Sequence, residues 1–210
     1  MAFKLDRPKL PHDLPTKTFE AIDGGYYDNC TFKDCVITRE DMARIAFDQV
    51  TFDHVQFEGS DFTNIEFTDC IFDHCDLSNA DFTGGSIHRV EFNHSKLIGV
   101  MMTESTLGNV LFDNCQLNLS SFGYSKLKQV RFIECAMKNS DLYECKFQKV
   151  DYQNCDLEEA NFANTRLTGV DLSTCSFTRM QVSLESMQGC IVSTDQALGF
   201  ARMLGLTIKE

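Results

Sequence analysis

The stretch "VTFDHVQFEGSDFTNIEFTDCIFDHCDLSNADF", from Val50 to Phe82, has a large apolar residue at every fifth position. Phenylalanine occupies six of these seven positions, and leucine occupies the remaining one, residue 77. A β-strand has a side-chain period of 2 and an α-helix one of 3.6, so neither element by itself explains a period of five. The period continues without insertion or deletion over 34 pentapeptides, from residue 25 to residue 194.

The residue two positions before each apolar centre is small or β-branched. All ten cysteines occupy this position, and 15 of the 18 phenylalanines occupy centres. Residues two apart in an extended segment point to the same face, so we expect both positions to face inward and the other three to face solvent and turn a corner. Repeated units of this kind predict a solenoid, in which each coil packs on its neighbours.

The number of pentapeptides in one coil follows from which residues align. At a spacing of 20, phenylalanine recurs at Phe32, Phe52, Phe72, Phe92, Phe112 and Phe132, and cysteine at Cys115, Cys135, Cys155 and Cys175. A spacing of 15 fits less well. We therefore predict four sides per coil, about 8.5 coils and a rod about 40 Å long.

Several pentapeptides resemble the repeat of the pentapeptide-repeat family, among them "ADFTG" at Ala80–Gly84, "CDLSN" at Cys75–Asn79 and "ANFAN" at Ala160–Asn164. The resemblance covers most of the chain. It implies an all-β solenoid, a right-handed quadrilateral β-helix, here followed by a short C-terminal helix.

An interior filled by phenylalanine and small residues leaves no cavity for a substrate, which argues against an enzyme. We identify no catalytic residues, no cofactor-binding residues and no metal ligands, and we interpret the cysteines as small inward hydrophobes. His54, His74 and His94 form a column at the outer corners. For this column an exposed polar ladder is favoured over a site for adventitious Zn²⁺ or Ni²⁺.

The composition is acidic, with 31 acidic and 19 basic residues, a formal net charge of −12 and a pI near 4.8. A phosphate backbone needs a basic surface, so direct binding of nucleic acid is not expected. No signal peptide and no apolar run of membrane-spanning length are evident. Ten cysteines at core positions indicate reduced thiols, and we expect a cytoplasmic protein with no cofactor, no membrane contact and no small-molecule substrate.

The acidic residues gather on two opposite sides of the predicted coil. We name each side by its first centre: Tyr27, Phe32, Ile37 and Met42. The Phe32 and Met42 sides together carry 14 acidic and 3 basic outward residues, whereas the Ile37 side is nearly balanced. The candidate partner-binding acids are Asp53, Asp73, Glu91, Asp113, Asp151 and Asp171 on the Phe32 side, and Asp61, Asp81, Asp141 and Glu144 on the Met42 side.

Some outward positions hold apolar residues instead. Met101, Tyr124 and Tyr143 fall on the Met42 side within three coils. Aromatic and methionine side chains on a polar surface indicate a contact patch, although scattered exposed apolar residues are also common.

The two ends depart from the period. We expect residues 1–24 to form an irregular arm covering the first coil, residues 25–194 the β-helix, and residues 195–210 a helix and short strand for dimerisation. Ser193 and Gln196 have capping-box spacing, Gly205 is a helix stop, and residues 206–208 read as a strand. The predicted dimer interface comprises Ala197, Phe200, Ala201, Leu204, Leu206 and Ile208.

This tail is similar to that of the quinolone-resistance branch of the family, the Qnr and MfpA-like proteins, and the stretch "GSIHRVEF" at Gly85–Phe92 resembles members from Gram-positive bacteria. The resemblance implies a dimeric DNA mimic that binds DNA gyrase and topoisomerase IV and reduces quinolone susceptibility. Loops that interrupt the repeats in plasmid-borne Qnr proteins are absent here. The alternative is a non-enzymatic scaffold or interaction module for another protein, with the charge serving solubility.

Overall fold

The computed structural model describes residues 3–20, 25–38, 45–58, 61–203 and 205–209. This part of the chain contains short β-strands followed by one α-helix. The elements are β1 (Tyr26–Lys33), β2 (Val36–Thr38), β3 (Ala46–Asp53), β4 (Gln56–Glu58), β5 (Glu66–Asp73), β6 (Ser86–Asn93), β7 (Thr106–Asp113), β8 (Lys126–Ile133), β9 (Lys146–Gln153), β10 (Ala160–Asn161), β11 (Met180–Gln181) and α1 (Thr194–Met203).

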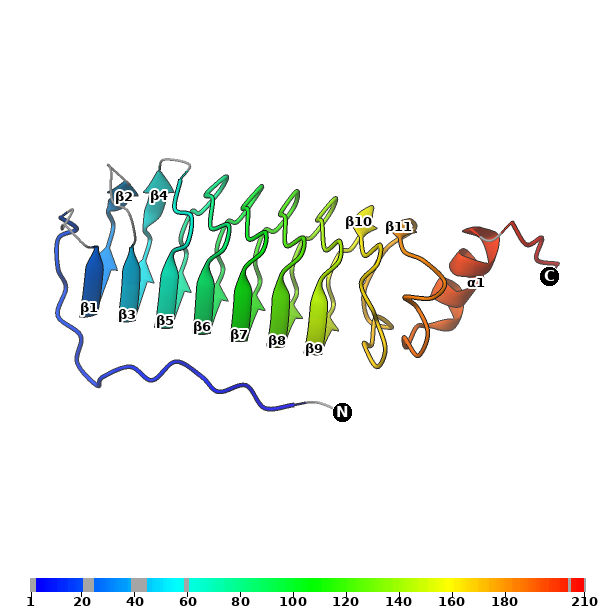
Figure 1. Ribbon diagram of the computed structural model, residues 1–210, viewed down its shortest axis with the longest axis horizontal. Coiled ribbons are helices and arrows are strands. Elements are labelled where there is room, and N and C mark those ends of the chain that lie inside the picture. The colour runs from blue at the N-terminus through cyan, green and yellow to red at the C-terminus, as the bar shows by residue number, and fades with distance from the viewer. Residues whose placement is uncertain (1–2, 21–24, 39–44, 59–60, 204, 210) are drawn as a thin grey trace.

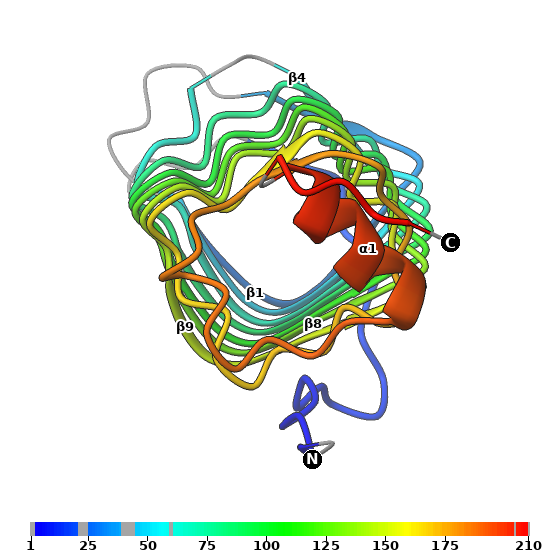
Figure 2. The same ribbon diagram turned by 90° about the vertical axis from the view of Figure 1, so that its right-hand side faces the viewer.

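The chain winds into a four-sided rod with α1 at its end (Figures 1 and 2). The eight-residue strands form one parallel sheet in the order β1-β3-β5-β6-β7-β8-β9. Each residue pairs with the residue 20 positions later, as Phe52 does with Phe72 and Val90 with Val110. The predicted all-β solenoid with four pentapeptides per coil is confirmed.

Two of the four sides differ from the prediction that every pentapeptide is a separate bridge and bend. One eight-residue strand covers the Tyr27 and Phe32 sides together, as β7 does from Thr106 to Asp113. From the third coil onward, the Ile37 and Met42 sides are mostly single bridges followed by turns, such as Gln116 with Ala136 and Asp81 with Met101. The long strands therefore concentrate on one half of the rod.

The regular coils number about seven, fewer than the 8.5 predicted from the period alone. The register persists into the next coil, where Asp156 pairs with Ser176 and Asp171 with Ile191. In that coil, however, the centres Phe177, Val182, Met187 and Val192 are only partly buried, and residues 184–189 form turns. A last coil has a neighbour on one side only, so its centres cannot be covered from both sides.

Stacked aromatic rings fill the rod. Phe92 and Phe112 lie 4.9 Å apart between ring centroids, and so do Phe112 and Phe132, with interplanar angles of 4° in both pairs. Both neighbours of Phe112 in this stack are fully buried, as Phe112 itself is. Several small inward residues donate a thiol or hydroxyl to a backbone carbonyl of the preceding coil, as Ser105 Oγ does to the Phe82 carbonyl at 2.9 Å, whereas the buried hydroxyls of Ser120 and Ser140 have no partner. The predicted inward positions are confirmed.

Each corner is made by the second residue after a centre, which adopts a positive φ angle. Among the described residues, 23 non-glycine residues have φ between 45° and 62°, all at this position of the repeat. Asparagine, aspartate and histidine tolerate this left-handed conformation better than most residues, which explains why they recur there. Side chains at the corners therefore form columns along the edges of the rod.

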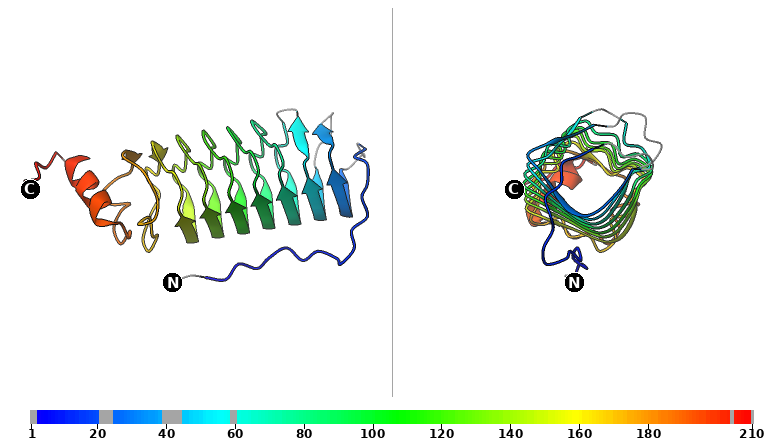
Figure 3. Two further views of the ribbon diagram at one scale, coloured as in Figure 1. Left: turned by 180° about the vertical axis from the view of Figure 1, so that it is seen from behind. Right: turned by 90° about the vertical axis from the view of Figure 1, so that its left-hand side faces the viewer.

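The N-terminal arm does more than cover the first coil. Phe19 does pack on that coil, with its ring 5.2 Å from Tyr27 and 5.8 Å from Phe32. From there the arm turns and runs back along the outside of the sheet (Figures 1 and 3). Its far end reaches β8, where Arg131 donates to the Phe3 carbonyl at 2.8 Å.

The C-terminal helix has the predicted caps. Ser193 N–H donates to Gln196 Oε1 at 2.8 Å and Gln196 N–H to Ser193 Oγ at 3.3 Å, which is a capping box. Gly205, with φ of 79°, ends the helix in a Schellman motif, because the N–H groups of residues 205 and 206 donate to the carbonyls of residues 202 and 201. The predicted strand at residues 206–208 does not form, since no strand lies beside this exposed segment to pair with it.

Candidate partner-binding surfaces

Half of the candidate acids of the Phe32 side are paired with lysine or arginine side chains of the same chain. Lys33 Nζ lies 2.6 Å from Asp53, and Arg131 Nε lies 2.9 Å from Asp151. Arg7 of the arm binds Glu91 through two nitrogens, at 2.7 and 2.9 Å. These contacts neutralise three of the six acids that the sequence assigns to a partner on this side.

The arm also covers the neighbouring edge of the same sheet. Asp69 is buried, and its carboxylate accepts two hydrogen bonds from Arg89, both at 2.6 Å, and one from the Lys9 N–H at 2.9 Å. Burial alone would raise the pKa of Asp69, but the Arg89 bonds, with the Lys9 N–H and the nearby positive charges, hold the pKa below its usual range. Asp69 therefore stabilises the folded arm and is not available to a partner.

The remaining acids of the Phe32 side have different surroundings. Asp73 lies beside His74 and His94, at 3.0 and 3.5 Å between the carboxylate oxygen and the two Nδ1 atoms. Asp113 stands in β7 between Asn93 and Ile133 of the adjacent strands. Asp171 accepts a hydrogen bond from the Ser173 N–H at 2.9 Å, and hydrogen bonding to Ser173 lowers the pKa of Asp171. These three acids are dispersed along the rod and do not form one cluster.

The Met42 side is the more open acidic surface. Asp61, Glu104 and Glu144 are exposed, and Asp81 and Asp141 are half-buried. The aspartates accept hydrogen bonds from nearby backbone amides, as Asp81 does from the Thr83 N–H at 2.9 Å. These bonds orient the carboxylates and leave their charge in place. Glu104 was not among the candidate residues, although its corner position marks it as outward.

Cations are absent from the described part of the Met42 side. Its outward positions between residues 61 and 184 include no lysine or arginine, and the one basic residue of this side in the sequence, Arg44, lies outside the described residues. Asp41, the first acid of the side, also lies outside them. From Asp81 to Glu144 the described outward positions of the Met42 side therefore hold acids without a lysine or arginine among them, unlike those of the Phe32 side.

The predicted apolar patch lies on this same side. Met101 is 38% exposed and Tyr124 is 53% exposed, and the Tyr124 and Tyr143 rings meet edge to face at 5.5 Å. Hydrogen bonding to Glu144 raises the pKa of the half-buried Tyr143, whose hydroxyl also accepts a bond from Asn164 at 3.1 Å. The structure thus joins the two tyrosines and links them to the acidic column.

Leu119 extends the patch beyond the residues selected from sequence. It is 63% exposed at the corner that precedes Ser121, and Ser121 pairs with Met101 of the preceding coil. Leu119 and Tyr124 have φ of 60° and 62°, a conformation that costs on the order of 1 kcal/mol for a residue with Cβ. Large apolar side chains at these solvent-facing corners are therefore not explained by the corner conformation itself, which the other corners share.

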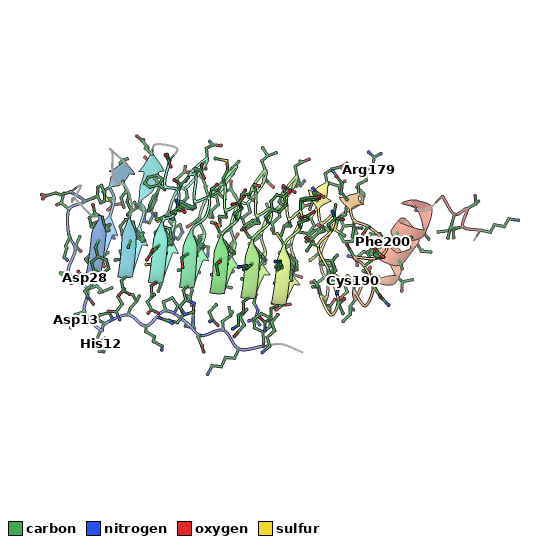
Figure 4. The ribbon with its side chains drawn as sticks, viewed as in Figure 1. His12, Asp13, Asp28, Arg179, Cys190 and Phe200 are labelled. Atoms are coloured by element: carbon green, nitrogen blue, oxygen red, sulfur yellow. The ribbon has the colours of Figure 1, made fainter. Side chains whose placement is uncertain are left out.

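The predicted dimer residues differ in how far they are exposed. Phe200 packs 5.6 Å from Phe177 of the last coil and therefore serves its own rod (Figure 4). Ala197 and Leu206 are exposed, and Leu198, which was not selected, is 38% exposed. Ala201 and Ile208 are half-buried, and Leu204 lies outside the described residues. An outward apolar surface thus remains on the helix end, next to Ile191 at 51% exposure.

The geometry defines the protein as a parallel β-helix with four pentapeptides per coil and columns of outward side chains along its edges. It belongs to the pentapeptide-repeat family, because the family model described as "Pentapeptide repeat region" matches residues 65–132 and 125–191. No curated protein matches the sequence. In the described chain, no helix has the length and apolar character needed to cross a membrane.

Three solved structures are similar to this chain at low sequence identity. QnrB1, a plasmid-mediated fluoroquinolone resistance protein, is 18% identical in its trypsin-treated M102R form, covering 73% of this chain and 95% of its own, with a TM-score of 0.41. HetL of Nostoc sp. strain PCC 7120, involved in heterocyst differentiation regulation, is 14% identical over 82% of this chain and 87% of its own, with a TM-score of 0.34. A pentapeptide repeat protein from the Arabidopsis thaliana thylakoid lumen is 13% identical over 49% and 68%, also with a TM-score of 0.34.

Proposed function

We propose that this protein is a non-enzymatic DNA mimic that binds a type II topoisomerase, DNA gyrase or topoisomerase IV, in the cytoplasm and reduces quinolone susceptibility. The observation that carries the proposal is the Met42 side, an acidic surface without a lysine or arginine at its described outward positions. A groove built to bind DNA presents positive charge, and such a groove attracts an acidic rod for the same reason.

The density of charge on this side compares well with one face of a duplex. Four carboxylates, from Asp81 to Glu144, lie along four coils, or about 14 Å at the usual strand separation. B-DNA carries about 8 phosphates over that length, and roughly half of them face any one protein surface. The Met42 side thus supplies about the number of anions that a partner would meet on DNA.

The choice of target depends on the resemblance of the tail to the quinolone-resistance branch, including its loopless Gram-positive members. The tail adopts the capped helix that this resemblance implies. We propose that residues 195–210 join two rods through a two-fold axis, with Leu198, Leu206 and the exposed Ala197 in the contact. In this division of the chain, residues 1–24 are the arm and residues 25–194 the β-helix.

The apolar patch adds a feature that DNA lacks. Met101, Leu119 and Tyr124 interrupt the acidic column between Asp81 and Asp141. Aromatic and methionine side chains are enriched at protein interfaces, so this patch would select one protein among many DNA-binding surfaces. The same patch also favours the second candidate function, an interaction module for a different protein.

The test is binding of purified gyrase to the tag-free protein across a salt series, with three matched triple variants. The first variant, Asp81→Lys, Glu104→Lys and Asp141→Lys, reverses the Met42 side. The second reverses Asp53, Asp73 and Asp113 on the Phe32 side, and the third changes Gln56, Asp76 and Gln116 of the balanced Ile37 side to lysine. We expect the first variant to lose binding, the second to be affected less and the third least.

Binding of the unaltered protein should weaken as salt rises, because exposed charges are screened beyond about 8 Å at physiological ionic strength. Free duplex DNA should compete with it. Equal binding by all three variants, or binding that neither salt nor DNA changes, would reject mimicry. If the Met101→Ser, Tyr124→Asn variant alone loses binding, the partner is recognised as an apolar surface and the interaction-module function is supported instead.

A further inference from the structure

We propose that Asp73, His74 and His94 form a binding site for one divalent transition-metal ion of the Zn²⁺ class. The site lies on the edge between the Phe32 and Ile37 sides, apart from the Met42 side and the tail. It is the one group of three or more ligand-type side chains that converge within 4.8 Å of one another in the described chain. The sequence alone favoured a polar ladder here, and the distances now favour a metal site.

The backbone fixes the histidines in a column. The same corner of three consecutive coils holds His54, His74 and His94, with φ of 53°, 54° and 49°. The His74 N–H donates to the Asn93 carbonyl at 3.1 Å. The ring centroids are 5.1 Å apart from His54 to His74 and 5.0 Å apart from His74 to His94. The imidazoles are therefore placed side by side by the coil register, before any ion binds.

Asp73 supplies an oxygen between two of these rings. Its Oδ1 lies 3.0 Å from His74 Nδ1 and 3.5 Å from His94 Nδ1. Two ligand atoms bound to one tetrahedral Zn²⁺ at about 2.05 Å are about 3.3 Å apart, and the two observed separations bracket that value. The side chains of His74 and His94 are both 50% exposed, so their rings have room to adjust around an ion.

The surroundings of the two carboxylates explain why the site forms at Asp73 and not at Asp53, the equivalent residue one coil earlier. Asp53 also faces a histidine, His54, but it is bound by Lys33 Nζ at 2.6 Å. The Lys33 ammonium already pairs with the Asp53 carboxylate, and its positive charge would repel a metal ion. The groups beside Asp73 are instead the two histidines, whose ring nitrogens can themselves bind a metal ion.

The donor set selects the class of ion. Two imidazoles with one carboxylate suit Zn²⁺, Cu²⁺ or Ni²⁺, whereas Ca²⁺ and Mg²⁺ require oxygen ligands. Three protein ligands leave a coordination position open. The three histidines line a groove on the surface of the rod together with Gln56, Asp76 and Lys96.

The experiment is calorimetric titration of ZnCl₂ into the tag-free, chelator-treated protein at neutral pH. The variants are His74→Asn, His94→Asn and Asp73→Asn, and the control is His12→Asn on the arm. Asparagine holds other corners of this rod, such as Asn114 with φ of 52°, so the two histidine variants keep the fold, which a thermal melt checks.

We expect one Zn²⁺ per chain with micromolar or tighter affinity, weakened about tenfold or more in each of the three variants and unchanged in the control. MgCl₂ in place of ZnCl₂ should give no heat of binding. No binding of Zn²⁺ by the unaltered protein, or equal affinity in His74→Asn, His94→Asn and His12→Asn, overturns the proposal. The same affinity in Asp73→Asn overturns the assignment of the carboxylate and with it the three-ligand site.

Discussion

Arg7 and Glu91 form a two-point ion pair across 84 residues of sequence, with Nε–Oε1 and Nη2–Oε2 distances of 2.7 and 2.9 Å. The Glu91 side chain is only 7% exposed, whereas that of Arg7 is 74% exposed. The arginine thus covers a carboxylate that is already largely withdrawn from water. This pair is one of the contacts by which the described part of the arm is attached to the sheet.

Replacing Arg7 by alanine should therefore destabilise the protein by about 1–2 kcal/mol, because Glu91 loses both charged hydrogen bonds while solvent already screens the exposed partner. The measurement is chemical denaturation. Lys4→Ala is the matched control, since Lys4 contacts the sheet through its backbone carbonyl and not its side chain. Equal losses of stability in the two variants would mean that the Arg7 side chain does not anchor the arm.

Asp69 should make stability depend on pH. Its pKa is below the usual range because of Arg89 and the Lys9 N–H, so its contribution is present above the ordinary aspartate pKa of about 3.9 and is lost as pH falls through the lower folded value. Asp69→Asn should be less stable than the unaltered protein at neutral pH, with the difference shrinking below about pH 4. Denaturation across pH measures this, with the exposed Asp13→Asn as control. A difference that stays constant down to about pH 3 would contradict the assignment.

The ring stack should be intolerant of truncation at its middle. Phe112→Ala should cost about 3–5 kcal/mol, because the ring is fully buried and stacks on both Phe92 and Phe132. Phe177→Ala in the loose last coil should cost clearly less, since Phe177 is only partly buried. Urea denaturation of both variants decides the matter. A larger loss at residue 177 than at residue 112 would mean that the end coil, not the stack, limits stability.

The thiols should fall into two kinetic classes. All ten cysteines are free, and only Cys35 and Cys190 are partly exposed. Burial raises the pKa of Cys190 to about 11 and that of Cys75 to about 12, so little thiolate exists at neutral pH. We expect two slow reactions with a thiol reagent in the native protein and eight more after denaturation. Native labelling of Cys135 or Cys155, identified by mass spectrometry, would show that the rod opens.

Two substitutions in the tail should separate its effect on dimer formation from its effect on stability. Leu206→Asp alters a residue that is 59% exposed, so it should convert the proposed dimer to a monomer without loss of stability. Phe200→Ala should instead lower stability through its contact with Phe177. Light scattering and thermal melts measure the two effects. A monomeric unaltered protein at micromolar concentration would restrict the tail to capping its own rod.

The period of five made the coil predictable, because every centre and every cysteine repeats the same inward geometry. Phe52 and Phe72, 20 residues apart, had to stack once the coil closed after four pentapeptides. The corners could not be read in the same way. Asparagine, aspartate and histidine at most corners are compatible with a positive φ, but leucine and tyrosine do not signal it, so the positive φ of Leu119 and Tyr124 follows only from closing the coil.

The path of the arm was missed for a different reason. Phe3, Leu5 and Leu10 are half-buried in the structure, and the alternation of Phe3 and Leu5 with polar residues was a signal for a segment lying on a surface. The outward Ile71 and Leu111 were the matching signal on the sheet. Neither was decisive, because the docking depends on particular pairs, such as Arg7 with Glu91, between segments far apart in sequence. The missing strand at residues 206–208 reflects the opposite error, since strand-forming residues there have no neighbouring edge to pair with.

The returning arm also changes the order in which the molecule can assemble. Coils 20 residues apart can form from any starting point along the rod, as nearest neighbours, with short loops to close. The arm has no surface to bind until several coils exist, and Arg131 meets Phe3 across 128 residues. We therefore expect its contacts to form late in folding, so that they slow unfolding and leave the folding rate nearly unchanged. The arm would thus lengthen the time for which the folded rod persists before it unfolds.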